Sequence, residues 1–115
     1  MHELSIALSI IEGAEEEAVR QGGGRVCAVH LRLGPLAGVV KEALLFSYEV
    51  ACEGTSLAGS NLVIEDVPLL ILCPQCRAER AAVSLQRLHC AECGTPAAEV
   101  LHGAELEVSA LELQT

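Results

Sequence analysis

CPQCRAERAAVSLQRLHCAECG, residues 73–94, decides the organisation of this chain, because it holds two Cys-X-X-Cys pairs separated by thirteen residues. In each such turn both thiolates point at one ion while nearby backbone amides hydrogen-bond to the sulfurs. Two turns together complete a tetrahedron of sulfur around zinc. Because four protein thiolates leave no open coordination position, the spacing predicts a structural Zn²⁺ site. Its expected ligands are Cys73, Cys76, Cys90 and Cys93.

Three other uses of these cysteines compete with zinc. Disulfides suit secreted chains, and the start of this sequence does not resemble a signal peptide. A thioredoxin-like redox role needs one pair at the start of a helix, whereas residues 72–99 show no helical period. Rubredoxin-like iron stays open, because four sulfur ligands do not by themselves separate iron from zinc. His89, directly before Cys90, is either a further donor to the site or an exposed loop residue.

The segments outside the cysteine pairs show helical and strand periods. Apolar residues recur at helical intervals over 4–20 and over 39–52. Alternation with a period of two indicates three strands, over residues 25–33, 61–67 and 105–113. We therefore predict an α+β fold: a small three-stranded sheet with two helices on one face, plus an inserted zinc-ribbon-like module of four cysteines.

The domain boundaries follow from where these periods stop. We expect residues 1–71 and 100–115 to form the α+β domain, and residues 72–99 to form an inserted zinc-binding domain that the metal organises. Cys27 and Cys52 lie outside both turns, at positions whose spacing buries them among aliphatic neighbours. They are most simply small core residues.

Charge and composition argue against several classes of function. Seven basic against sixteen acidic residues give a formal net charge of −9, which opposes binding to nucleic acid or to an anionic membrane. No apolar run approaches the roughly 20 residues that span a bilayer, so we expect a soluble, cytoplasmic protein. We expect no enzymatic activity, because the chain lacks a Ser-His-Asp order, a glycine-rich phosphate loop and a second metal motif of carboxylate and histidine.

The first three residues, Met1, His2 and Glu3, bring several nitrogen donors together. The α-amino group, the main-chain nitrogens of His2 and Glu3, and the His2 imidazole can wrap one ion, and tetragonal nitrogen coordination suits Ni(II) or Cu(II). A single histidine near a chain end is more often an ordinary surface residue. From the residues alone, both interpretations stay open.

Four segments together resemble the HypA family of hydrogenase maturation proteins over essentially the whole chain. They are MHELSIA (1–7), GTSLAGSNLVIEDVP (54–68), the two Cys-X-X-Cys turns and GAELEVSALEL (103–113). The resemblance implies a nickel site on Met1, His2 and Glu3, within a nickel-binding domain of residues 1–71 and 100–115, and zinc on the four cysteines. It implies a metallochaperone that carries Ni²⁺ and delivers it during maturation of a [NiFe]-hydrogenase, and in some members to urease.

The same resemblance implies two partners, a HypB-type GTPase and the large subunit of the hydrogenase, and it leaves a homodimer open. The sequence departs from the usual family ribbon in having no aromatic residue between the cysteine pairs and in having CAECG where CPxCG is common.

The main alternative is a zinc-ribbon interaction module or accessory factor whose N-terminus has no special role. The evidence for nucleic-acid binding is weak, because this region has only three arginines, without neighbouring lysine or aromatic residues: Arg77, Arg80 and Arg87. A further nickel ligand could come from His89, His102 or a partner.

Overall fold

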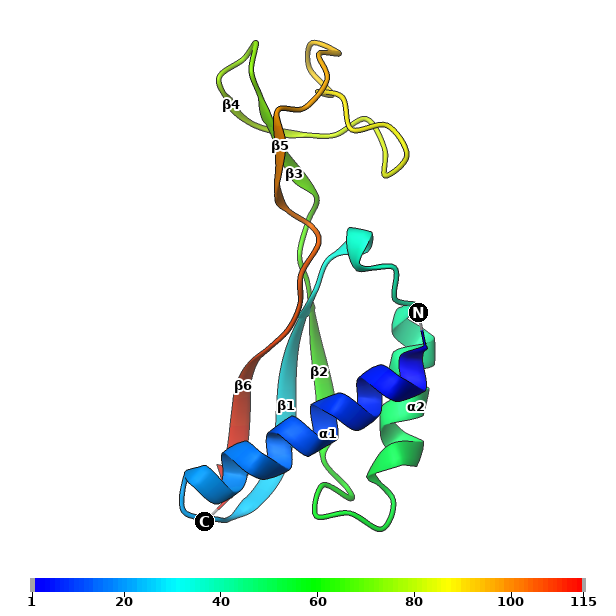
Figure 1. Ribbon diagram of the computed structural model, residues 1–115, viewed down its shortest axis with the longest axis vertical. Helices are drawn as coiled ribbons and strands as arrows, with labels where there is room; N and C mark the ends of the chain where they lie inside the picture. The colour runs from blue at the N-terminus through cyan, green and yellow to red at the C-terminus, as the bar shows by residue number, and fades with distance from the viewer. Residues whose placement is uncertain (1, 115) are drawn as a thin grey trace. The chain divides into compact units, whose positions relative to one another are not determined.

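The computed structural model describes residues 2–114, which form two α-helices, one short 3-10 helix and six strands (Figure 1). The helices are α1 (Glu3–Arg20), η1 (Pro35–Ala37) and α2 (Lys41–Cys52). The strands are β1 (Arg25–Leu33), β2 (Asn61–Asp66), β3 (Leu70–Cys73), β4 (Ala78–Ala81), β5 (Glu99–His102) and β6 (Leu106–Gln114). The chain divides into two compact units, of which the second comprises Arg32–Ala37 and Asp66–Leu106.

The first unit is built on a three-stranded sheet in the order β2-β1-β6, with α1 and α2 packed against each other on one face of it (Figure 1). The inward sides of the helices and the central strand β1 supply an aliphatic core. Its helical members are Ala7, Ile10, Ile11, Ala14, Ala18, Leu44, Tyr48 and Cys52. The members from β1 are Val26, Ala28, Val29 and Leu31. This arrangement confirms the α+β fold predicted from the helical and strand periods.

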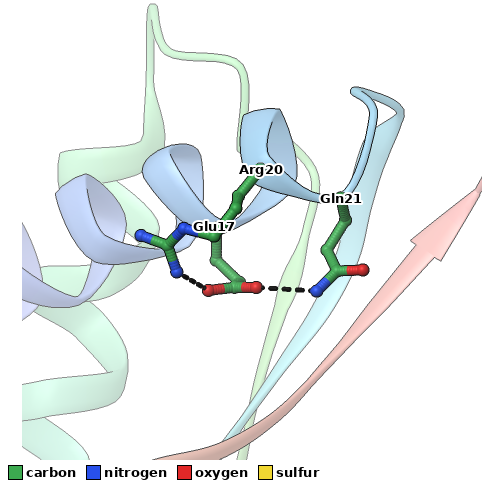
Figure 2. Close-up of polar contacts among 3 residues, drawn as sticks. All are labelled: Glu17, Arg20 and Gln21. Carbon is green, nitrogen blue, oxygen red and sulfur yellow. Dashed lines mark hydrogen bonds and ion pairs between the residues drawn. The ribbon is translucent and has the colours of Figure 1, made fainter.

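The end of α1 is set by side chains in its last turn and by the glycines after it. Figure 2 shows that the Glu17 carboxylate contacts both the Arg20 guanidinium and the Gln21 side-chain amide. A cation in the last turn also interacts favourably with the helix dipole, although at an exposed site the gain is small. Gly23 donates its backbone N–H to the carbonyl of Ala18 and has φ of 85°. This left-handed conformation suits glycine, so the helix stops here and the chain turns into β1.

Cys27 and Cys52 differ in burial. Cys52 is 3% exposed, and its Sγ lies 3.9 Å from Ser60 Oγ, which in turn lies 2.7 Å from the Tyr48 hydroxyl. Burial raises the pKa of Tyr48 to about 12. Cys52 is therefore a core residue, as expected, whereas Cys27 is only half-buried, with its Sγ 3.8 Å from the side-chain oxygen of Gln114.

The second unit contains a second sheet, in the order β4-β3-β5, which the sequence periods did not predict. Strand β3 pairs antiparallel with both neighbours, so that Ile71 lies opposite Arg80 on β4 and opposite Val100 on β5. Its small core consists of Ile71, Cys73 and Cys90. Each of these strands is four residues long. That length holds only two repeats of the strand period, too few to stand out in the sequence.

Two glycines let distant segments of the second unit come into backbone contact. Leu36 donates its backbone N–H to the carbonyl of Gly103 at 2.7 Å, and Gly34 donates to the carbonyl of Glu105 at 2.8 Å. A Cβ atom on Gly34 would lie 2.2 Å from the carbonyl carbon and oxygen of Gly103. Position 34 therefore tolerates no side chain without a backbone shift. No helix within residues 2–114 has both the length and the apolar character that crossing a membrane requires.

Candidate metal centre

The sulfur atoms of Cys73, Cys76, Cys90 and Cys93 all lie within 4.8 Å of one another. The Sγ–Sγ distance is 3.5 Å between Cys73 and Cys93, 3.7 Å between Cys76 and Cys93, and 4.0 Å between Cys76 and Cys90. With Zn–S bonds of about 2.3 Å, the edges of a zinc–sulfur tetrahedron are about 3.8 Å long. The three closest sulfur pairs are therefore spaced as the ligands of one tetrahedral ion are.

Both cysteine pairs sit in turns closed by equivalent backbone hydrogen bonds. In the first turn Arg77 donates its N–H to the carbonyl of Cys73, and in the second Gly94 donates to the carbonyl of Cys90, both at 2.8 Å. The two donors adopt left-handed backbone conformations, with φ of 56° at Arg77 and 78° at Gly94. The backbone N–H of Cys76 also points to Cys73 Sγ at 3.3 Å. Each turn therefore presents its cysteines toward a shared centre, as metal-binding knuckles do.

The second knuckle is tied to the first by the end of strand β4. Ala91 donates its backbone N–H to the carbonyl of Ala81 at 2.9 Å, and Ala82 forms an isolated antiparallel bridge with Cys90. His89 lies just before this bridge, and its Nδ1 is 3.0 Å from the carbonyl oxygen of Gly94. The side chain of His89 thus contacts the backbone of the second turn and is not a member of the sulfur cluster.

The four thiols differ in burial and in acidity. Cys73 and Cys90 are buried, Cys76 is half-buried and Cys93 is exposed. Hydrogen bonds from the hydroxyl and the main chain of Thr95 lower the pKa of Cys93 to about 6. The neighbouring sulfurs of Cys73 and Cys93 raise the pKa of Cys76 to about 11. At neutral pH the exposed Cys93 therefore offers a thiolate for capture of a cation, and the proton of Cys76 must leave as the ion is enclosed.

The N-terminal residues predicted to bind nickel lie at the start of α1, except Met1, which lies outside the described residues. His2 is exposed, has extended backbone angles and precedes the first helical residue, Glu3. A carboxylate oxygen of Glu3 accepts a hydrogen bond from the backbone N–H of Val40 at 3.2 Å, and this bond lowers the pKa of Glu3. Within residues 2–114, the four cysteines are the only group of three or more His, Cys, Asp or Glu side chains placed to hold one ion. Side chains alone therefore do not assemble a second site at this end.

His102, the other histidine considered as a nickel ligand, lies in the second unit. Its Nδ1 is 3.2 Å from a carboxylate oxygen of Glu105, whose other oxygen accepts the backbone N–H of Gly103 at 2.7 Å. The bond from Gly103 is the main cause that lowers the pKa of Glu105, and His102 lowers it further. The contacts of His102 thus stabilise the turn between β5 and β6.

Comparison with known proteins identifies the family. A family model described as "Hydrogenase/urease nickel incorporation, metallochaperone, hypA" matches residues 1–113. The chain is 49% identical over 112 residues to the hydrogenase maturation factor HypA of Chloroflexus aurantiacus, an alignment that covers 97% of this chain and 98% of that protein. It is 42% identical over 109 residues to the factor of the same name from Streptomyces avermitilis, covering 94% of this chain and 83% of that protein.

Solved structures support the same fold. The solution structure of the Ni metallochaperone HypA from Helicobacter pylori superposes with a TM-score of 0.68 at 23% identity, covering 98% of this chain and 97% of that one. A second solution structure of a HypA protein gives a TM-score of 0.73 at 23% identity, covering 99% and 97%. Because the family model spans nearly all residues and full-length relatives approach half identity, the chain belongs to the HypA family of nickel metallochaperones that act in hydrogenase maturation.

Proposed function

We propose that this protein binds Ni²⁺ through Met1, His2 and Glu3 and delivers it to a [NiFe]-hydrogenase during maturation. The observation that carries the proposal is the family match over residues 1–113, which includes the Met-His-Glu start. A metal carrier must bind its cargo selectively and still release it, which favours an exposed and incompletely closed site. The exposed position of His2 at the beginning of α1 meets that need.

We propose that Glu3 contributes its main-chain nitrogen rather than its carboxylate to the nickel site. The carboxylate is engaged with the backbone N–H of Val40, 3.2 Å away. The first N–H groups of a helix have no acceptor within that helix, so the nitrogen of Glu3 is not needed for the hydrogen bonding of α1. Together with the amino group of Met1 and the nitrogens of His2, it forms a compact set of nitrogen donors that suits tetragonal Ni(II).

The proposed role of Cys73, Cys76, Cys90 and Cys93 is to hold a structural Zn²⁺. The spacing of their sulfurs supports a tetrahedral ion, and zinc would supply a crosslink between the two knuckles. Accordingly, residues 72–99 form the proposed zinc-binding domain, and residues 1–71 and 100–115 form the nickel-binding domain.

The proposed partners are a HypB-type GTPase and the large subunit of the hydrogenase, and urease is a proposed second client. Transfer occurs by ligand exchange, in which donor groups of the recipient replace those of Met1, His2 and Glu3 one after another. We propose that these events take place in the cytoplasm. The net charge of −9 supports protein partners and metal cations over nucleic acid.

Metal titration tests these assignments. Purified protein that begins at Met1 should bind one zinc ion tightly and one nickel ion more weakly. His2→Ala should lower nickel affinity at least tenfold, about 1.4 kcal/mol, and leave zinc content unchanged. Cys76→Ala should abolish zinc retention and spare nickel binding. His102→Ala is the matched histidine control and should change neither. Nickel binding that survived His2→Ala would place the site elsewhere in the chain.

A further inference from the structure

Arg80 lies on the same face of strand β4 as the residues that pair with two of the cysteines. In the antiparallel ladder Ala78 lies opposite Cys73, and just beyond the strand Ala82 bridges to Cys90. Residues two apart in a strand share one face, and directly paired residues of antiparallel strands point to the same side. The register therefore places Arg80, midway between Ala78 and Ala82, on the face that carries these cysteines.

The guanidinium of Arg80 lacks one hydrogen bond that its burial requires. Nη1 donates to the carbonyl of Glu79 at 3.1 Å. Nε is buried, and no atom of the described residues 2–114 accepts its N–H. A buried donor without an acceptor costs free energy, and more so when the donor is charged. An acceptor that carries negative charge when the site is loaded would remove this cost.

The sulfur of Cys76 is the group that can act as this acceptor. Interaction with the Cys76 side chain is the main cause that raises the pKa of Arg80. Cys76 is also the half-buried member of the first knuckle, so water and competing ligands reach it more easily than they reach Cys73. A donor beside this sulfur therefore protects the more accessible metal bond of that turn.

A contact between Arg80 and a cysteine sulfur would also be favoured electrostatically. Four thiolates around one Zn²⁺ carry a net charge of −2, in a chain whose formal charge is already −9. A guanidinium next to one sulfur reduces the net negative charge of the zinc-loaded site from −2 to −1. Its positive charge also disfavours protonation of that sulfur. Groups that hydrogen-bond to metal ligands commonly change metal affinity by about 10–100-fold.

We propose that Arg80 is a positioning residue of the metal centre: it donates an N–H to the Cys76 sulfur, offsets part of the thiolate charge and thereby tightens metal binding. This inference rests on the proposed zinc site, and it assigns Arg80 a role in affinity that the cysteine pattern does not contain. Lysine cannot fully replace arginine here, because the planar guanidinium presents Nε and Nη donors in a fixed arrangement.

Zinc affinity, measured by competition with a chromogenic chelator, tests the proposal on the full chain. Arg80→Gln should weaken zinc binding about tenfold. Arg80→Lys keeps the charge and should weaken it about threefold. Arg87→Gln is the matched control, because Arg87 lies in the segment between the two cysteine turns but is exposed and belongs to neither turn. The zinc affinity of this variant should stay within about twofold of the unaltered value. If Arg80→Gln does not fold, the lysine variant carries the test, and unaltered affinity in it would contradict the proposal.

Cobalt(II) bound in place of zinc separates a hydrogen bond to sulfur from simple packing. The sulfur-to-cobalt charge-transfer band reports the electron density on the thiolates, so loss of a donor should move the band to lower energy in Arg80→Gln and not in Arg87→Gln. Unchanged zinc affinity in Arg80→Gln, or weakened affinity with an unmoved cobalt band, would overturn the proposal. If the unaltered protein bound neither zinc nor cobalt, the proposed zinc site itself would fail, and the role of Arg80 with it.

Discussion

A carboxylate oxygen of Glu3 lies 3.2 Å from the backbone nitrogen of Val40, the residue that immediately precedes α2. The hydrogen bond joins the start of the first helix to the start of the second, across 37 positions of sequence. The side chain of Glu3, a residue proposed to bind nickel, therefore also has a structural role. The carboxylate and the main-chain nitrogen of Glu3 can therefore be tested separately.

Glu3→Gln should make the stability of the fold less sensitive to acid. The folded-state pKa of Glu3 is lowered, chiefly by the bond from Val40. The stabilisation from its carboxylate is therefore complete above the unfolded-state value of about 4.3 and is lost as pH falls through the lower folded-state pKa. Thermal unfolding followed by circular dichroism between about pH 7 and pH 3 should show a smaller fall in Tm for Glu3→Gln than for the unaltered protein. Parallel curves would mean that the bond is absent in solution.

An added residue before Met1 should weaken nickel binding and leave the fold intact. The extension converts the amino group of Met1, a good donor once deprotonated near pH 8, into an amide that binds metal only after losing a far less acidic proton. We expect at least a tenfold loss of nickel affinity, roughly 1.4 kcal/mol, with zinc content and Tm unchanged. Calorimetric titration of extended and unextended protein makes the comparison. Equal affinities would exclude the amino group as a ligand.

Two glycine-to-alanine substitutions should have opposite effects on stability. At Gly34 a Cβ would lie 2.2 Å from the backbone of Gly103, so Gly34→Ala should destabilise the protein by about 2 kcal/mol through forced backbone movement. At Gly13, inside α1, a Cβ meets no atom within 4 Å. Gly13→Ala should therefore stabilise the protein by about 1 kcal/mol through better helix propensity. Urea unfolding measures both changes in the free energy of unfolding. An unchanged free energy of unfolding in Gly34→Ala would show that the backbone around Gly103 moves at little cost.

Zinc removal should disorder residues 72–99 and leave the first unit folded. The core of the second unit is small, consisting of Ile71 and two of the proposed zinc ligands. The first unit has its own aliphatic core on α1, α2 and β1. After chelation, amide exchange should become fast for residues 72–99 while β1 and α1 keep their protection. Global loss of protection would show that the two units do not fold separately.

Several features of this protein are readable in the sequence because each is a local pattern repeated enough times to be recognised. The strand predicted over residues 25–33 coincides with β1, and the helix predicted over 4–20 differs from α1 by one residue. Both segments are long enough to hold several periods of apolar residues. The cysteine spacing likewise singled out four residues whose sulfurs the structure brings within 4.8 Å of one another.

Other features were decided only by the tertiary structure, because they join residues that no local pattern relates. Strands β3, β4 and β5 are too short to show a period, and their pairing depends on how the chain returns after the cysteine turns. The bond between Glu3 and Val40 and the contact of Gly34 with Gly103 arise from the path of the backbone. The face of β4 on which Arg80 lies, shared with Ala78 opposite Cys73, follows from strand register. A shift of one residue would have turned its side chain to the opposite face.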